Sequence, residues 1–230
     1  MSEPPPPAGG AGGSAGSNPS GRYGWFVGVL AVLILAYIGI NTLRTTGPGS
    51  EGPRVGRVLP PFAAPLLLSS LAGDADVAAR PHSGRAGGVP ACSVHLPGAL
   101  NSCDLARPGP VVLGFFFTRG AHCTGSLDAM QRLSKRTPGV RYAGVVVRGD
   151  RGAAAKIVHQ HHWTFPIVYD HDGGLANVYG IAGCPEVVLA YPGGVVRGTI
   201  VGRDQAERDL SSHVAGLVAA SRARGWRPPA

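Results

Sequence analysis

The chain has 230 residues, enough for one ordinary domain with additional segments at its ends. Its formal net charge of +8 comes mostly from arginines scattered along the sequence and from the closing segment SRARGWRPPA. Scattered positive charge indicates a solvated basic surface, which suits a position near an anionic membrane. It argues against nucleic acid as a partner.

The N-terminal part carries two segments outside the predicted domain. Residues 1–23 open with MSEPPPPAGGAGGSAGSNPSG, which has too few apolar side chains to fold, so we expect a disordered tail. Residues 24–43 carry no charge, and about twenty apolar residues match a bilayer core of roughly 30 Å, which predicts a transmembrane helix. A cleaved signal peptide is the alternative, but the run is long for one and no good small-x-small cleavage site follows it.

The orientation of this helix is predicted from the cysteines. Arg22 precedes the apolar run whereas Arg44, Arg54 and Arg57 follow it, so the positive-inside count points weakly to an outside N-terminus. Every cysteine follows the run, which suits a domain on the oxidising side. We therefore expect a single-pass protein of the cell membrane with an extracytoplasmic C-terminal domain. The cysteines are Cys92, Cys103, Cys123 and Cys184.

The predicted domain begins after a linker. Residues 44–57, RTTGPGSEGPRVGR, are rich in Gly and Pro, which interrupt regular structure, so we expect a flexible tether. The folded domain is expected over 58–222 and a basic tail over 223–230. Between Leu59 and Ala106 the pattern is irregular and predicts one or two short strands with loops.

The periodicity is clearer from Pro110 onward. Apolar runs at 111–117 and 139–147 are typical of strands buried on both faces of a sheet. Helices are expected over 121–135, 151–163, 174–180 and 206–223, and further strands over 166–170 and on both sides of the hairpin turn Pro192-Gly193-Gly194. This order predicts an α/β fold with a central mixed sheet flanked by helices.

Two segments carry a resemblance to a known family. VVLGFFFTRGAHC resembles the strand and active-site segment of thioredoxin-like proteins, and FPIVYDHDGGLANVYGIAGCPEVVLAYPGGVV resembles the later part of the membrane-tethered thiol:disulfide interchange and redoxin group. The resemblance covers residues 58–220 and implies a thioredoxin-like fold with a cis peptide bond between Cys184 and Pro185. The motif is degenerate, because Gly120 stands where the family carries its attacking cysteine and Cys123 fills only the second position.

The resemblance also implies where a redox centre would lie. In the family the attacking thiolate is stabilised by the N-terminus of a helix, and Cys123 lies in the first turn of the corresponding predicted helix. The residue before the cis proline packs against the active-site sulfur, so Cys184 is expected close to Cys123. His122 either stabilises a thiolate as a cation or simply fills the motif. We take His122 and Pro185 as the expected substrate-binding residues.

Three states of the two thiols stay open on the sequence: an exchanging pair, a static disulfide, or two reduced cysteines. The first favours a thiol-disulfide oxidoreductase that acts on a protein thiol or disulfide client and needs no cofactor. The alternative is a redox-inactive module that binds a protein in the groove beside the cis-proline loop. A peroxiredoxin-type antioxidant is less favoured, because Gly120 stands where such a protein would need threonine.

The other cysteines, Cys92 and Cys103, bracket SVHLPGALNS, in which Pro97-Gly98 indicates a turn. A local disulfide that closes a hairpin is the simplest interpretation and would contribute about 2–3 kcal/mol of stability. An exchanging pair is disfavoured there, because the sequence predicts no helix N-terminus nearby.

No metal site is expected. His159 and His162 share a helix face, but further ligands at tetrahedral spacing are missing and His161 points elsewhere, so a solvated polar face is favoured. Asp170 and Asp172 lack the alternating ligands of a calcium loop and predict a turn.

Overall fold

The computed structural model describes residues 20–44, 51–73, 89–118 and 124–229. The chain divides into two compact units, Met1–Thr46 and Gly47–Ala230. The first unit contains helix α1, Ser20–Arg44, whose large apolar side chains between residues 25 and 38 are exposed. Among the described residues, no helix meets the combined length and apolarity of a membrane span.

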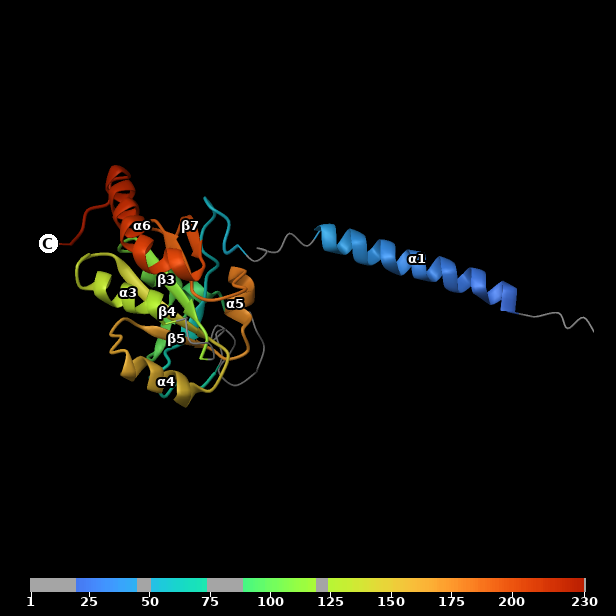
Figure 1. Ribbon diagram of the computed structural model, residues 1–230, viewed down its shortest axis with the longest axis horizontal. Coiled ribbons are helices and arrows are strands. Elements are labelled where there is room, and N and C mark those ends of the chain that lie inside the picture. The colour runs from blue at the N-terminus through green and yellow to red at the C-terminus, as the bar shows by residue number, and fades with distance from the viewer. Residues whose placement is uncertain (1–19, 45–50, 74–88, 119–123, 230) are drawn as a thin grey trace, which may run out of the picture. The chain divides into compact units, whose positions relative to one another are not determined.

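The second unit is built on a five-stranded mixed sheet with the strand order β5-β4-β3-β6-β7 (Figure 1). Strands β3, β4 and β5 are parallel, whereas β6 runs antiparallel to β3 and β7 antiparallel to β6. A second, two-stranded sheet pairs β1 with β2 in antiparallel fashion. The strands are β1 Ala63–Pro65, β2 Ala99–Asn101, β3 Val111–Phe116, β4 Arg141–Val147, β5 Ile167–Asp170, β6 Glu186–Ala190 and β7 Val196–Val201.

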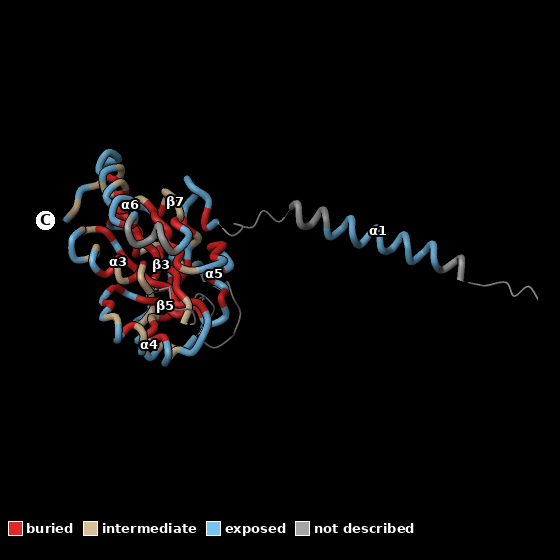
Figure 2. Tube along the Cα trace, viewed as in Figure 1, coloured by how far each residue is buried: buried red, intermediate tan, exposed pale blue. Residues whose placement is uncertain are grey.

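Helices cover both faces of the large sheet and enclose two apolar clusters. One cluster joins α3, α4 and α6 to the sheet through residues such as Leu127, Val158 and Leu217. The other joins α5, α2 and the segment 59–64 to the opposite face. Figure 2 shows that the buried residues concentrate on the strands and on the inner sides of the helices. The helices are the 3-10 turn η1 Ala91–Ser93, α2 Ser102–Ala106, α3 Gly125–Ser134, α4 Arg151–Gln160, α5 Gly174–Tyr179 and α6 Arg203–Ala223.

The predicted α/β fold with a mixed sheet flanked by helices is confirmed, and its elements differ from the prediction only locally. The helix predicted over 151–163 ends at Gln160, because His162 adopts a left-handed conformation with φ +54° and the chain turns inward to bury Trp163. The start of the helix predicted over 121–135 lies outside the described residues, and α3 is described from Gly125. One or two short strands were expected between Leu59 and Ala106, and two are present, β1 and β2.

Candidate redox site

Cys184 lies two residues before the N-terminal end of strand β6. The Cys184-Pro185 peptide bond is cis, as the resemblance implied. Cys184 is half-buried and packs against the cluster formed by α3, α4 and α6, whereas Pro185 is buried. The sulfur of Cys184 takes part in a disulfide bond. Cys184 is therefore positioned by a central strand, whose first residue, Glu186, pairs with Phe115 of β3.

The remaining residues of the predicted motif, Gly120, His122 and Cys123, lie outside the described residues. A strand and a helix flank the motif as expected, with shorter bounds: β3 ends at Phe116, and α3 begins at Gly125 after Thr124. The distance between Cys123 and Cys184 therefore stays a prediction, as does the substrate-binding role of His122 and Pro185.

Helix α3, which follows the motif, lies very close to strand β3. A Cβ atom on Gly114 would come within 2.6 Å of Met130 Sδ, so any larger residue there would force the Met130 side chain to move. The close packing fixes the distance of α3 from the sheet, because Met130 is fully buried between them.

Polar contacts hold the other side of α3. The Asp128 carboxylate accepts a hydrogen bond from the Trp163 indole at 2.7 Å and lies 3.0 Å from Nδ1 of His161. One turn later, the Gln131 amide donates to Thr164 Oγ1 at 2.9 Å and accepts from the Thr164 backbone N–H at 2.7 Å. The sequence did not predict this tie between α3 and residues 161–164, because it joins segments more than thirty residues apart.

The histidines and aspartates that the sequence analysis weighed as metal ligands lie in different environments. His161 is half-buried beside Asp128 rather than on a solvated face, whereas His159 and His162 are exposed. Asp170 is buried and accepts hydrogen bonds from the first amides of α5, and Asp172 accepts one from Gly174 N–H. Within the described part of the chain, no three His, Cys, Asp or Glu side chains gather as a metal site would require.

Glu186 is the functional candidate that the sequence analysis missed. The residue has no exposed surface, and neither carboxylate oxygen has a hydrogen-bond partner among the described residues. Burial raises the pKa of Glu186 to about 7. The backbone N–H groups of Ala182 and Gly183 oppose part of this rise, although neither forms a hydrogen bond with the carboxylate. The available signal was a charged residue directly after Cys-Pro, at the head of the otherwise apolar strand EVVLA.

The predicted disulfide between Cys92 and Cys103 is confirmed, with a Cα–Cα distance of 5.4 Å. The expectation that no helix N-terminus lies near this pair is wrong, because Cys103 is the second residue of helix α2. The helix begins there because Asn101 caps it and accepts hydrogen bonds from the N–H groups of Cys103 and Asp104. A helix of five residues is too short to leave a periodic pattern in the sequence.

Comparisons with known proteins agree on the fold. No family model and no curated protein sequence matches the chain. Among solved structures, a protein of Bacteroides thetaiotaomicron named as a protein disulfide isomerase is 13% identical, with a TM-score of 0.56 over 77% of this chain and 99% of that one. A protein of Chlorobium tepidum named as the thiol:disulfide interchange protein DsbE is 20% identical, with a TM-score of 0.54 over 72% and 98%.

A third structure, the peroxidoxin BcpB of Mycobacterium tuberculosis, is 16% identical with a TM-score of 0.53 over 72% of this chain and 97% of that one. At these identities the likeness concerns the fold. The class that the fold and the comparisons define is therefore a thioredoxin-like α/β protein, similar in structure to thiol-disulfide oxidoreductases.

Proposed function

We propose that the chain is a thiol-disulfide oxidoreductase in which Cys123 and Cys184 are the exchanging cysteines. The observation that carries this proposal is the surroundings of Cys184: a half-buried, disulfide-bonded sulfur stands two residues before a fully buried carboxylate in a thioredoxin-like fold. A buried carboxyl group with a pKa near 7, two residues along the chain from a cysteine, suits a site that transfers protons at neutral pH.

The reaction follows from ordinary thiol-disulfide exchange. In the reduced protein the Cys123 thiolate attacks a client disulfide, which forms a mixed disulfide and releases one client thiolate. Cys184 then loses its proton, and its thiolate attacks the Cys123 sulfur. This step breaks the mixed disulfide, releases the second client thiolate and leaves the Cys123–Cys184 disulfide. A dithiol of a donor or client protein reduces the pair again.

Glu186 supplies the proton acceptor in this proposal. Because the pKa of Glu186 is about 7, its carboxylate and carboxylic acid forms are both populated near neutral pH. The carboxylate can take the proton of Cys184 when that thiol becomes the nucleophile, and the acid can return it when the thiolate leaves. A carboxyl group with an ordinary pKa would be a poorer match for a thiol.

The test is a trapped mixed disulfide with insulin as the disulfide probe. With Cys184→Ser, attack by Cys123 is expected to stop at the mixed disulfide, because no second thiol resolves it. The control is Ser212→Ala, a change at an exposed residue of α6, which should keep the turnover of the unmodified chain. Unchanged insulin reduction by both Cys184→Ser and Cys123→Ser would contradict the proposal.

We place this activity on the outer side of the cell membrane, with residues 24–43 as the single membrane span and 44–57 as the tether. The support is the uncharged sequence of that segment and the exposure of its large side chains, such as Trp25 at 66% and Leu35 at 68%, which an apolar medium would cover. The disulfide Cys92–Cys103 supports an oxidising compartment.

One observation favours a second candidate function. Gly120 stands where the resembled family has its attacking cysteine, so the domain can instead be a redox-inactive module that binds a protein client. In that case Cys123→Ser would leave client capture unchanged, whereas an oxidoreductase would lose covalent capture completely.

A further inference from the structure

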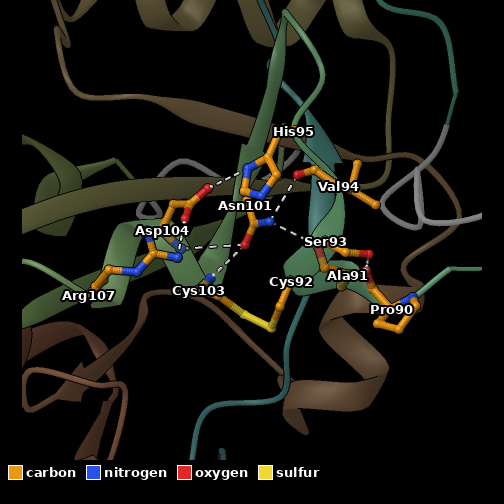
Figure 3. Close-up of polar contacts among 10 residues, drawn as sticks. All are labelled: Pro90, Ala91, Cys92, Ser93, Val94, His95, Asn101, Cys103, Asp104 and Arg107. Atoms are coloured by element: carbon orange, nitrogen blue, oxygen red, sulfur yellow. Dashed lines mark hydrogen bonds and ion pairs between the residues drawn. A yellow bond between two sulfur atoms is a disulfide. The ribbon is translucent and has the colours of Figure 1, made fainter.

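The Cys92–Cys103 disulfide lies at the surface of the second unit, between η1 and α2. Cys92 is exposed and Cys103 is half-buried, so reagents in solution reach the bond without unfolding of the domain. Figure 3 shows the disulfide together with the polar contacts of Asn101, His95 and Asp104 in the same bridged region.

The bridged segments are also held together without the disulfide. Asn101 is only 6% exposed, and its amide donates hydrogen bonds to the carbonyls of Ala91 and Val94, both at 2.9 Å. Its Oδ1 accepts from the N–H of Cys103 at 2.8 Å (Figure 3). One buried side chain therefore ties the residues next to Cys92 to the residue Cys103 itself. When the disulfide opens, these contacts keep the two thiols near one another.

A pocket adjoins Cys103 but not Cys92. Its volume is about 260 Å³, and its walls are mostly apolar, from Leu59, Ala106 and the hairpin residue Gly194. Arg107 also lines it, and this guanidinium stays 72% exposed although its Nη2 pairs with Asp104 at 2.7 Å. A small molecule with a thiol and a carboxylate matches a pocket that is lined by a cysteine, apolar side chains and an arginine.

We propose that the Cys92–Cys103 disulfide is a second thiol-exchange site, which takes a small anionic thiol in the pocket beside Cys103. The thiolate of the small molecule attacks the Cys103 sulfur from the pocket side, opposite to Cys92. A mixed disulfide forms at Cys103, the Cys92–Cys103 bond breaks, and Cys92 leaves as a thiolate. Cys92, held nearby through Asn101, attacks back and expels the thiol. A second molecule of thiol can instead attack the adduct, which yields the small-molecule disulfide and reduced Cys103.

The first experiment uses the full oxidised chain and reduced glutathione as the probe, with acid quenching, alkylation and peptide mapping. We expect glutathione on Cys103 and alkylation of Cys92, with an unchanged circular dichroism spectrum. An adduct found on Cys92 alone, or no adduct until denaturant is added, would overturn the proposal. Peptides containing Cys123 and Cys184 are quantified in the same digest, so this result is separate from the proposed oxidoreductase activity.

The second experiment tests the pocket with oxidised glutathione and the Cys92→Ser variant, in which Cys103 is a lone thiol. Its thiolate attacks the probe disulfide, forms the adduct and releases reduced glutathione. Adding Arg107→Ala should slow this reaction about fivefold, which corresponds to the loss of a surface charge contact of about 1 kcal/mol. The cationic disulfide cystamine should show no such slowing. The control Arg54→Ala removes an exposed arginine that does not line the pocket. Equal effects of the two arginine variants would contradict the assigned pocket.

Discussion

Glu186 is the side chain whose environment is most unusual in this domain. A carboxyl group with no exposed surface and no hydrogen-bond partner among the described residues is costly to ionise. Its pKa of about 7 in the folded protein lies above the ordinary value of 4.5. Folding therefore favours the protonated form of Glu186, and ionisation of Glu186 destabilises the folded protein.

This pKa gives stability a definite pH dependence. Because the folded-state pKa is raised, the contribution of Glu186 is fully present below its ordinary pKa and is lost as pH rises through about 7. With Glu186→Gln, which cannot ionise, we expect the loss of stability between pH 5 and pH 8 to become smaller by roughly 1–3 kcal/mol. Thermal unfolding of both proteins at the two pH values measures this, and parallel pH profiles would contradict the assignment.

The same variant tests proton transfer. If Glu186 accepts the proton of Cys184, Glu186→Gln should shift the pH profile of insulin reduction upward, because the thiol then loses its proton to solvent. Glu51→Gln is the control, since Glu51 is an exposed carboxyl group near the start of the domain. A profile that moves equally in both variants would show that Glu186 has no special role.

Sequence reasoning reached Cys184 but not Glu186, and the reason is physical. Cysteine before proline is uncommon enough to mark a site by itself. A glutamate at the start of a strand is ordinarily exposed, and only the register with Phe115 in β3 shows that this one is buried. The Asn101 hydrogen bonds could not be predicted from the sequence either, because they depend on the position of the η1 turn in the folded domain.

Arg151, the first residue of α4, links this helix to a loop 80 to 85 residues earlier in the chain. Its guanidinium donates hydrogen bonds to the carbonyls of Leu66, Leu67, Ser69 and Leu71 at 2.8, 2.9, 2.7 and 2.9 Å. The guanidinium also lies 5.6 Å from the ring centre of Tyr169 in β5. Leu66 and Leu67 themselves contact the edge strand β5, so this one side chain helps to cover the edge of the sheet.

Removing this link should weaken the domain and release the loop. Arg151→Ala is expected to lower the free energy of unfolding by about 1–3 kcal/mol, because four carbonyls lose a charged donor. Limited proteolysis should become faster within residues 66–73. Lys156→Ala, an exposed residue of the same helix, is the control and should change stability by less than about 0.5 kcal/mol. Equal stabilities of the two variants would contradict the role given to Arg151.

The elements that the sequence predicted best are those with continuous apolar patterns. The strands β3 and β4 bury every residue from Val111 to Phe116 and from Tyr142 to Val147, so an unbroken apolar run was a sufficient signal. Helix ends were less predictable. The chain leaves α4 at Gln160 because Trp163 must reach Asp128, and this is a tertiary requirement without a local signature.

The two units of the chain serve different purposes in the proposal. The second unit, Gly47–Ala230, contains the central sheet, the Cys92–Cys103 disulfide and the proposed pair Cys123 and Cys184. The first unit contains the apolar segment that we take as the membrane span. Deleting residues 1–43 should leave the thermal unfolding of the domain unchanged while moving the protein from the membrane fraction to the soluble fraction. Cell fractionation and differential scanning calorimetry measure the two effects. Membrane association that survives the deletion would contradict a span at 24–43.

The oxidoreductase proposal depends most on whether the disulfide of Cys184 exchanges in the folded protein. The decisive measurement is its reduction potential in the full chain, obtained from dithiothreitol redox buffers with alkylation and peptide mapping of Cys123 and Cys184. We predict reduction under native conditions with a potential well above roughly −300 mV, the value below which structural disulfides usually lie. Thiols that stay inaccessible until the domain unfolds would identify a static disulfide and contradict the proposed function.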